Sequence, residues 1–395
     1  MPYYRQVGEV PRKRHTQFRP AGNGYHPEEL MGQEGFSDTS ALLYHRNSPS
    51  ALLAIEAADA AGTAGHGCDE VLQPNHPLRP HHLRTGGLPV TPATDLVLGR
   101  QLLLGNDDVH LSFARATTTS PLYRDAVGDQ LVYLHTGSAV LESVYGALDV
   151  RAGDYVVIPT STTHRWVVDG QASALIFEAR GHVRLPDRYR SRAGQLLEGA
   201  PFSERDFRGP DAPLLVEGEE VPVLVRTRQG LSRHVHATHP FDVVGWDGYL
   251  YPYALSIHDF EPIVGRIHQP PPVHQTFAGP NFVVCSFVPR LYDFDPNAVK
   301  VPYHHANVDS DEVLFYADGN FMSRAGSGIG VGSISLHPAG FVHGPQPGSF
   351  ERSIDQDRTS ELAVMLDTFR PLQLSGAALA VSDDSYPWSW VPRTQ

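Results

Sequence analysis

Histidine and carboxylate residues gather in one part of the C-terminal half of the chain, and both are side chains that bind metal ions. Residues 303–319 contain His305, Asn307 and Glu312, and residues 332–343 end in His343. Two imidazoles and one carboxylate can occupy one face of an octahedral ion, which leaves open positions for a substrate and for dioxygen. These residue types therefore predict a metal centre with room for oxygen chemistry.

The spacing of these residues resembles the two sequence motifs of the cupin superfamily. The first motif is matched by His305, one residue, Asn307, four residues, Glu312, six residues and a glycine, with Asn307 where the superfamily has a second histidine. The second motif, Gly-x5-Pro-x-Gly-x2-His, is matched at every fixed position from Gly332 to His343. The resemblance implies the metal ligands His305, Glu312 and His343, because Asn307 in place of an imidazole favours three protein ligands.

The N-terminal half contains an incomplete copy of the same pattern. Gly153, Pro159 and His164 repeat the spacing of glycine, proline and histidine in the second motif. The positions of the carboxylate ligand and of the first histidine ligand hold Gln130 and Tyr123 instead. Such a set binds a metal poorly, so we expect one metal ion per chain and a structural or lid-forming N-terminal half.

Short β-favouring runs, closed by turn residues, must position these side chains. The main runs are residues 95–99, 130–134, 154–159, 282–288, 312–316, 332–336 and 362–366. No long amphipathic helix is indicated, although residues 51–61 have some helical character. The repeat of short strands predicts an all-β fold with two jelly-roll or cupin-like β-barrel units, a bicupin.

The expected division of the chain has three parts. Residues 1–60 are polar and rich in glycine and predict an irregular N-terminal arm. Residues 61–225 predict an N-terminal cupin-like β domain without metal, and residues 226–395 predict a C-terminal cupin domain with the iron site. A connection rich in proline, glycine and charge, residues 181–218, lies between the two β-rich halves.

The C-terminal half also resembles one family within the superfamily, the homogentisate 1,2-dioxygenases. The resemblance covers about residues 240–370 and is carried by residues 242–253, 301–307, 332–337 and 343–351. It implies an Fe(II) enzyme that cleaves the ring of a small aromatic acid with O2. The family reaction converts homogentisate to maleylacetoacetate in tyrosine and phenylalanine catabolism. The resemblance further implies a homo-oligomer, a trimer or hexamer.

The resemblance also implies roles for individual residues. His268 and His337 fall at the positions of histidines beside the metal and are the expected catalytic residues. The expected substrate-binding residues are Tyr303, Asn307, Arg324 and His343. Arg324 could hold a substrate carboxylate through two parallel hydrogen bonds.

Departures from the family pattern leave alternatives open. The spacing between the first histidine and Glu312 is seven rather than six, so Asp311 is an alternative carboxylate ligand. Phe321 and Arg324 stand where the family has tyrosine and lysine. These changes are compatible with the same iron chemistry on gentisate or another hydroxylated aromatic acid. A non-catalytic bicupin binding protein and a zinc cupin isomerase are further alternatives.

Composition excludes several other classes of partner. The 31 basic and 44 acidic residues give a net charge of −13, which argues against a nucleic-acid partner. The N-terminus has no apolar signal, and the chain has no run of 18 apolar residues. We therefore expect a cytoplasmic, soluble protein with no membrane partner. The remaining histidines, among them His81, His82, His234, His236 and His239, are expected at the surface, in solvated loops or behind the metal ligands.

Overall fold

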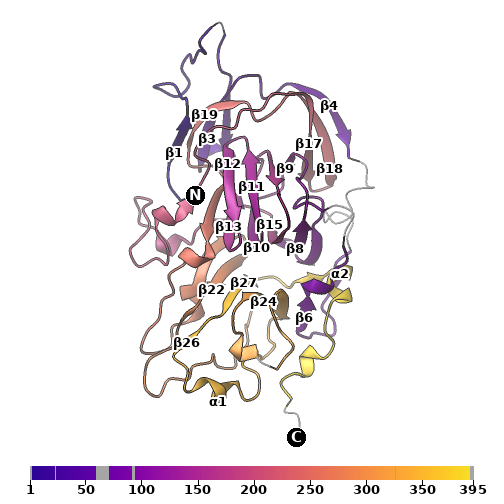
Figure 1. Cartoon of the computed structure of the whole chain (residues 1–395), viewed down its shortest axis with the longest axis vertical. Coiled ribbons are helices and arrows are strands. Elements are labelled where there is room, and N and C mark those ends of the chain that lie inside the picture. Colours follow the sequence, from indigo (N-terminus) through magenta and orange to yellow (C-terminus); the bar gives the residue numbers. More distant parts are fainter. Residues whose placement is uncertain (1, 23, 59–70, 91–93, 325, 392–395) are drawn as a thin grey trace.

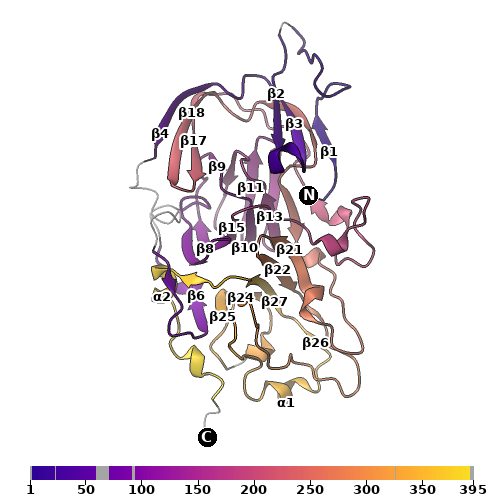
Figure 2. The ribbon, with the colours of Figure 1, turned by 180° about the vertical axis from the view of Figure 1, so that it is seen from behind.

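The chain is built mainly of β-strands, as predicted (Figure 1). A computed structural model describes residues 2–22, 24–58, 71–90, 94–324 and 326–391. Two β units are stacked along the long axis of the molecule, and the C-terminal segment lies at the end of the second unit (Figures 1 and 2). The predicted all-β, two-unit fold is therefore confirmed.

Two facing sheets form the first unit. The strands of the nine-stranded sheet are, in spatial order, β16 (Phe207–Arg208), β20 (Tyr253–Ser256), β13 (Asp154–Ile158), β10 (Gln130–Thr136), β15 (Ala172–Ala179), β8 (Val109–Ala116), β7 (Gln101–Gly105), β28 (Gln373–Leu374) and β5 (Gln73–Pro74). The strands of the seven-stranded sheet are β12 (Gly146–Arg151), β11 (Ser138–Ser143), β14 (His164–Val167), β9 (Tyr123–Asp125), β17 (Glu219–Thr227), β18 (Gly230–Thr238) and β4 (Leu52–Ala57).

The second unit has a six-stranded sheet that borrows one strand from the first half of the chain. In spatial order its strands are β21 (Gln275–Gly279), β22 (Phe282–Phe287), β27 (Leu362–Thr368), β24 (Asp311–Asp318), β25 (Ser333–His337) and β6 (His81–Arg84). A short ladder joins β23 (Arg290–Leu291) to β26 (Arg358–Thr359). The loop before β24 supplies His305, and the loop after β25 supplies His343.

The N-terminal residues are more regular than the predicted arm. They contribute β1 (Arg5–Gly8), β2 (Glu28–Gly32) and β3 (Ser40–His45) to a four-stranded sheet with β19 (Val243–Gly248). Strand β3 is mostly apolar and buried, and it can be buried only if it pairs and packs with other strands. This explains why the N-terminal residues form regular structure. Strands β17 to β20 pair with strands of the first half. The predicted boundary at residue 226 thus lies within β17, and strand pairing favours a change of unit after Ser256.

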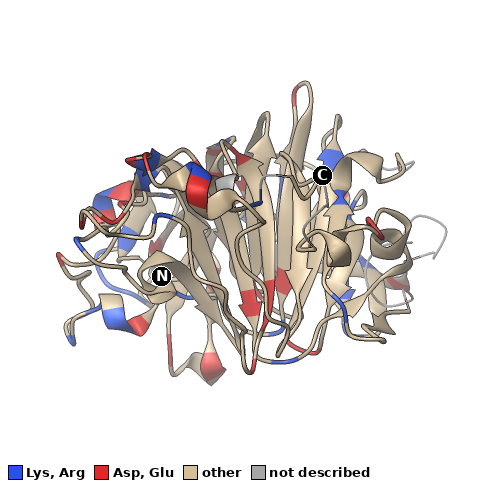
Figure 3. Ribbon diagram, turned by 90° about the horizontal axis from the view of Figure 1, so that it is seen from below, with Lys and Arg blue, Asp and Glu red and all other residues tan. Residues whose placement is uncertain are grey.

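The two units share a core because their sheets pack back to back. Successive side chains of a strand point to opposite faces of its sheet. On β10, Val132 and Leu134 line the interior of the first unit, while Leu131 and Tyr133 belong to the core shared with the second unit. The ring of Tyr133 lies 6.2 Å from that of Phe315 across this interface. Both faces are buried, and the charged residues of the central strands, such as Glu178 and Glu312, lie near the strand ends (Figure 3).

Two glycines explain why both copies of the first motif end at the same residue type. Gly137 follows β10 with φ of 79°, and Gly319 follows β24 with φ of 90°. A Cβ atom would lie 2.0 Å from the carbonyl oxygen of Gln171 at the first position and 1.9 Å from that of Ser360 at the second. Only glycine tolerates both the left-handed backbone and the close approach.

Two predicted elements differ from those observed. Residues 95–99 form a turn rather than a strand, because Asp95 Oδ1 accepts the N–H groups of Val97 and Leu98 at 2.7 and 2.8 Å. Residues 52–57 form strand β4 rather than a helical segment, because they pair with β18. The rest of that predicted segment, from residue 59, lies outside the described residues.

Several histidines expected at the surface are buried. His81 and His82 lie on β6 and are 3% and 0% exposed, because β6 is an added strand of the second sheet. His236 lies on strand β18 rather than in a loop, and it is 6% exposed. The prediction for these residues is wrong because pairing between distant segments decides their burial.

Helical structure is limited to short segments. The described α-helices are α1 (Ser349–Ser353) and α2 (Gly376–Ala380). Short 3₁₀ turns occur at Glu34–Phe36, Thr85–Gly87, Asp187–Tyr189, Glu204–Asp206, Ile257–Asp259, Pro271–His274, Met322–Arg324 and Tyr386–Trp388. Among the described residues, no helix has the length and apolar character needed to cross a membrane.

Candidate metal centre

His305 and His343 are held side by side by their own backbones. The N–H of each residue donates to the carbonyl oxygen of the other, at 2.8 Å in both directions. This isolated antiparallel bridge joins the loop before β24 to the loop after β25. The ring centroids lie 4.3 Å apart as a result. Backbone pairing therefore brings the histidines of the two motifs together without a regular strand.

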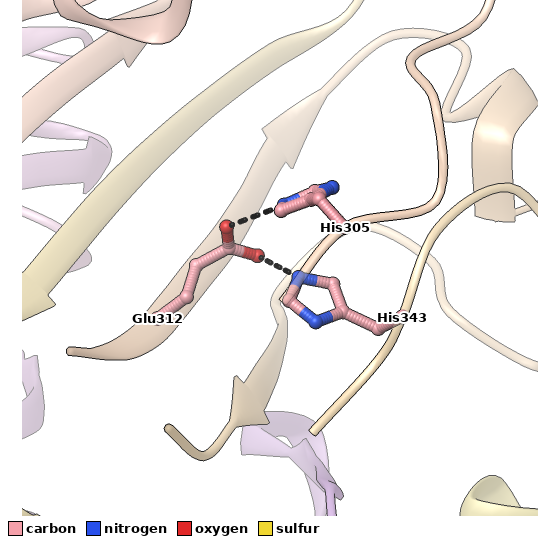
Figure 4. A group of neighbouring side chains, drawn as sticks. All are labelled: His305, Glu312 and His343. Atoms are coloured by element: carbon pink, nitrogen blue, oxygen red, sulfur yellow. Dashed lines mark hydrogen bonds and ion pairs between the residues drawn. The ribbon is translucent and has the colours of Figure 1, made fainter. Parts of the chain in front are cut away.

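Glu312 on β24 completes the group (Figure 4). Its Oε2 lies 3.6 Å from Nε2 of His305, and its Oε1 lies 3.2 Å from Nε2 of His343. One ligand atom from each residue lies within 4.8 Å of the others. Glu312 and His343 are buried, whereas the His305 side chain is 32% exposed, so the group is most open on the His305 side. The structure thus brings together the predicted ligand set.

Hydrogen bonds to the backbone orient both imidazoles. Nδ1 of His305 donates to the carbonyl oxygen of Tyr303 at 3.2 Å, and Nδ1 of His343 donates to that of Phe341 at 3.0 Å. A metal-binding histidine usually donates its other ring nitrogen in this way, which fixes the ring and its tautomer. The Nε2 atoms are therefore the ones directed at Glu312 and available to a metal.

Electrostatics keeps the carboxylate of Glu312 ionised. Burial by itself would raise its pKa, but hydrogen bonds from His305, His337 and His343 outweigh burial and hold the pKa well below the ordinary value. The hydrogen bond to Glu312 in turn raises the pKa of His305. With Nδ1 donating to the backbone, Nε2 reaches the carboxylate only by carrying a proton. A divalent cation would replace these protons, so the donor set fits a metal ion.

His337 supports the group from the neighbouring strand β25. It is fully buried and stacks on His343, with ring centroids 4.1 Å apart and planes inclined by 17°. Nδ1 donates to Glu312 Oε1 at 3.0 Å, and Nε2 accepts the hydroxyl proton of Tyr386 at 2.8 Å. Burial lowers the pKa of His337 to about 3, so the ring is neutral. Both nitrogens are engaged within the protein.

Comparison with known proteins places this centre in a family. The family models described as Homogentisate 1,2-dioxygenase N-terminal and Homogentisate 1,2-dioxygenase C-terminal match residues 43–257 and 253–394. The chain belongs to the homogentisate 1,2-dioxygenase family. It is a dioxygenase, and the family implies a bound metal, for which the site around Glu312 is the candidate among the described residues.

Individual relatives agree with this family. A protein of Saccharolobus solfataricus, named "Putative dioxygenase SSO1533", is 39% identical over 394 residues, which is 99% of each chain. The homogentisate 1,2-dioxygenase of Emericella nidulans is 26% identical over 300 residues, which cover 70% of this chain and 65% of that protein. A solved cupin 2 conserved barrel domain protein from Leptotrichia buccalis is 10% identical, with a TM-score of 0.36, over 73% of this chain and 96% of that one.

Asp311, the alternative ligand, points away from the metal centre of this dioxygenase. Its Oδ1 accepts the N–H of Ala339 at 2.8 Å, and its Oδ2 accepts the N–H of Leu372 at 2.7 Å. Neighbouring residues of a strand face opposite sides, so Asp311 and Glu312 cannot both face the histidines. The geometry therefore favours Glu312 as the ligand.

Three other predicted residues lie around the exposed side of the site. His268 has a side chain 45% exposed, with Nδ1 3.4 Å from Oδ2 of Asp293. Its ring contacts that of Tyr303 at 5.0 Å, and the Tyr303 ring lies 6.3 Å from that of His305. The backbone carbonyl oxygen of Asn307 accepts the N–H of Gly340 at 2.7 Å. His268 is therefore linked to the ligands through Tyr303 rather than by direct contact.

Arg324 is a buried cation beside the metal group. It is 7% exposed, and it donates from Nη1 to the carbonyl oxygen of Gly344 at 2.8 Å and from Nε to the hydroxyl of Tyr316 at 3.2 Å. No carboxylate among the described residues forms an ion pair with it. Phe321 packs on Tyr316 at 4.9 Å within the apolar interior of the second unit. A buried guanidinium without an acidic partner is a favourable place for an anion.

Two further residues at the site, Asp367 and Tyr386, were not among the predicted site residues. Asp367 on β27 is the cross-strand neighbour of Glu312, and its buried Oδ1 has no hydrogen-bond partner among the described residues. Burial and the charge of Glu312 raise the pKa of Asp367 to about 8. Tyr386 comes from the C-terminal segment. The acid at the end of a core strand was a usable signal for Asp367, whereas nothing local marked Tyr386.

Proposed function

We propose that the protein is an Fe(II)-dependent ring-cleaving dioxygenase that converts homogentisate and O2 to maleylacetoacetate. This reaction belongs to tyrosine and phenylalanine catabolism. The observation that supports it is the combination of the His305, Glu312 and His343 group with the nearby buried Arg324, which bonds to the carbonyl oxygen of Gly344 and forms no ion pair among the described residues. The group of two histidines and one glutamate fits Fe(II), and Arg324 fits the carboxylate of an aromatic acid.

Iron would be held by Nε2 of His305, Nε2 of His343 and the carboxylate of Glu312. Neutral imidazole and carboxylate ligands suit Fe(II), and three protein ligands leave positions for two further partners. Bound there, iron would supply a site at which a deprotonated phenol and dioxygen are activated together. The protein contributes the orientation of these ligands through the backbone carbonyls of Tyr303 and Phe341.

Arg324 would bind the substrate carboxylate. Its Nη1 donates to the carbonyl oxygen of Gly344, the residue after His343, at 2.8 Å, and this position beside the metal group suits a substrate that spans both. A guanidinium can form two parallel hydrogen bonds with a carboxylate, which orients the ring as well as binding it. Tyr303 and Asn307 would contact the substrate from the exposed side. The apolar residues Leu314 and Met365 would face its ring.

His268 is the better placed of the two proposed catalytic histidines for moving a proton. Its ring is partly exposed, and Oδ2 of Asp293 lies 3.4 Å from Nδ1, which can orient the ring. It would accept the proton of the substrate phenol as the substrate enters. His337 has both nitrogens engaged, so it would act by holding Glu312.

The test is anaerobic reconstitution of the full chain with Fe(II), followed by homogentisate and air. Oxygen uptake with one equivalent of ultraviolet-absorbing, ring-opened product supports the proposal, and His305→Ala should abolish both. Uptake with gentisate but not homogentisate would replace the substrate while keeping the chemistry. Tight Fe(II) binding without uptake on any hydroxylated aromatic acid would favour a binding protein. Sedimentation of the same sample tests the proposed trimer or hexamer.

A further inference from the structure

A buried cluster of charged side chains occupies the first unit at the place where the second unit has its metal centre. Strand pairing establishes the correspondence. Tyr123 on β9 is the antiparallel partner of His164 on β14, as His305 is the partner of His343. The two histidine-bearing bridges are therefore equivalent positions in two copies of one fold.

The carboxylate position is equivalent in the same way. Gln130 on β10 pairs with Glu178 on β15, and Glu312 on β24 pairs with Asp367 on β27. Each of these pairs lies on two neighbouring inner strands of its sheet. Gln130 thus stands where the second unit has its carboxylate ligand, and Glu178 stands where it has its second acid.

His164 keeps the orientation of a metal ligand. Its Nδ1 donates to the carbonyl oxygen of Thr162 at 2.9 Å, two residues earlier in the chain. His343 makes the same bond to Phe341 at 3.0 Å. His164 is 1% exposed, and its Nε2 has no hydrogen-bond partner among the described residues. A metal site that loses its ion would leave an imidazole nitrogen without a partner in this orientation.

The buried side chain of Arg100 lies close to the residues that occupy the ligand positions of the first unit. The side chain is 1% exposed. Its Nη1 donates to Glu178 Oε1 at 2.9 Å, and its Nη2 donates to Gln130 Oε1 at 3.0 Å. The guanidinium carbon lies 5.5 Å from the centroid of the Tyr123 ring. Its charge also acts on His164, whose pKa burial lowers to about 4. One buried cation is therefore shared by the equivalents of all three ligands.

A second arginine completes the charge balance. Arg226 on β17 donates to Asp125 Oδ2 at 2.9 Å and lies 3.5 Å from Glu178. Two cations, Arg100 and Arg226, thus face two carboxylates, Glu178 and Asp125, inside the barrel. Buried charges are tolerated when they are paired and hydrogen-bonded in this manner. The set is neutral without any added ion.

We propose that the first unit preserves the frame of a second metal site, in which the Arg100 guanidinium takes the place of the ion. The replacement of the ion by the Arg100 guanidinium explains why Gln130 stands at the position of the carboxylate ligand. The amide oxygen of Gln130 accepts a hydrogen bond from Arg100, whereas a carboxylate there would add a second negative charge beside Glu178. The cation of the first unit is a covalent part of the chain, so this unit keeps its fold when metal is removed, and only the second unit responds to metal.

Metal stoichiometry tests the proposal in the full-length chain. Arg100→Met/Tyr123→His/Gln130→Glu restores the donor types and removes the guanidinium, and it should bind two Co(II) ions per chain. The matched control Tyr123→His/Gln130→Glu keeps Arg100 and should bind one, like the wild type. A folded triple variant that binds one ion, or a control that binds two, would show that Arg100 does not stand in the place of the ion.

Thermal unfolding of the metal-free chain provides a second test that needs no new site. Arg100→Met removes the buried ion pair with Glu178 at 2.9 Å, and it should lower Tm by roughly 5–10 °C. Arg100→Met/Glu178→Gln also removes the carboxylate that has lost this ion pair and should recover part of the loss. A double variant no more stable than Arg100→Met would overturn the assignment of Arg100 as the neutralising cation.

Discussion

Glu312 and His337 face each other across β24 and β25, and Nδ1 of His337 lies 3.0 Å from Oε1 of Glu312. On its other side His337 is held by the hydroxyl of Tyr386 at 2.8 Å. An imidazole fixed at both nitrogens is a rigid donor. It orients the carboxylate ligand from outside the metal site, and such partners strongly influence metal affinity.

His337→Phe is therefore expected to weaken metal binding about 10- to 100-fold while the chain remains folded. The loss follows from an unsupported Glu312 carboxylate rather than from a missing ligand. Competition between the protein and a chelator for Co(II) measures the change. The control is His239→Phe, which replaces another buried histidine outside the metal group. Equal metal affinity in His337→Phe and the wild type would contradict the positioning role.

Glu312 and Asp311 are adjacent in sequence, and their variants should behave differently. Glu312→Gln removes a charged ligand and should abolish Fe(II) retention with little change in the fold. Asp311→Asn weakens the acceptors of two backbone N–H groups and should reduce stability by about 1–3 kcal/mol while keeping the metal. Metal content and urea unfolding of both variants provide the comparison. Loss of metal from Asp311→Asn alone would reverse the ligand assignment.

Arg324→Met should raise KM for the aromatic acid by roughly 10- to 150-fold, because a charged hydrogen-bond pair of about 1.5–3 kcal/mol is lost. Arg324→Lys should recover only part of the loss, because an ammonium cannot form the two parallel bonds of a guanidinium. Initial rates of oxygen uptake measure both. Binding of 1,4-dihydroxybenzene, which lacks the carboxylate, is the control and should change little. An equal loss for both compounds would indicate a structural effect.

His45 joins the strands of the four-stranded N-terminal sheet in a pH-dependent way. Burial alone would lower its pKa, but hydrogen bonds to Asp242 at 2.7 Å and Glu29 at 3.0 Å outweigh burial and raise the pKa to about 9. The folded pKa lies above the unfolded value of 6.5, so the stabilisation is complete below pH 6.5 and is lost as pH rises through 9. The shift corresponds to a contribution on the order of 3 kcal/mol.

Unfolding of the wild type and His45→Gln across this pH range tests whether protonated His45 stabilises the folded chain. The stability difference between them should be largest near pH 6 and should shrink by pH 10. A difference that stays constant with pH, or grows above pH 9, would show that the charge of His45 does not stabilise the N-terminal sheet.

Local patterns predicted the features of this protein that depend on neighbours in sequence. Alternation within strands, the turn glycines and the motif spacing predicted that Glu312 and His343 lie in one group, as they do, because each signal depends on a few adjacent residues. Two predictions failed for different reasons. The strand expected at residues 95–99 was replaced by a turn that the Asp95 side chain forms with its own neighbours, and His82 was buried because β6 pairs with the distant strand β25.

The amino-acid sequence by itself determined the donor types, their spacing and the loss of two ligands in the first unit. Only the tertiary structure decided which charges are buried and what they face. Arg324 donates to the Tyr316 hydroxyl and to a backbone carbonyl and forms no ion pair among the described residues, whereas Arg100 forms an ion pair with Glu178. No local pattern in the sequence distinguishes the two arginines. The energy of a buried charge depends on the groups that long-range packing brings to it, so only the tertiary structure separates them.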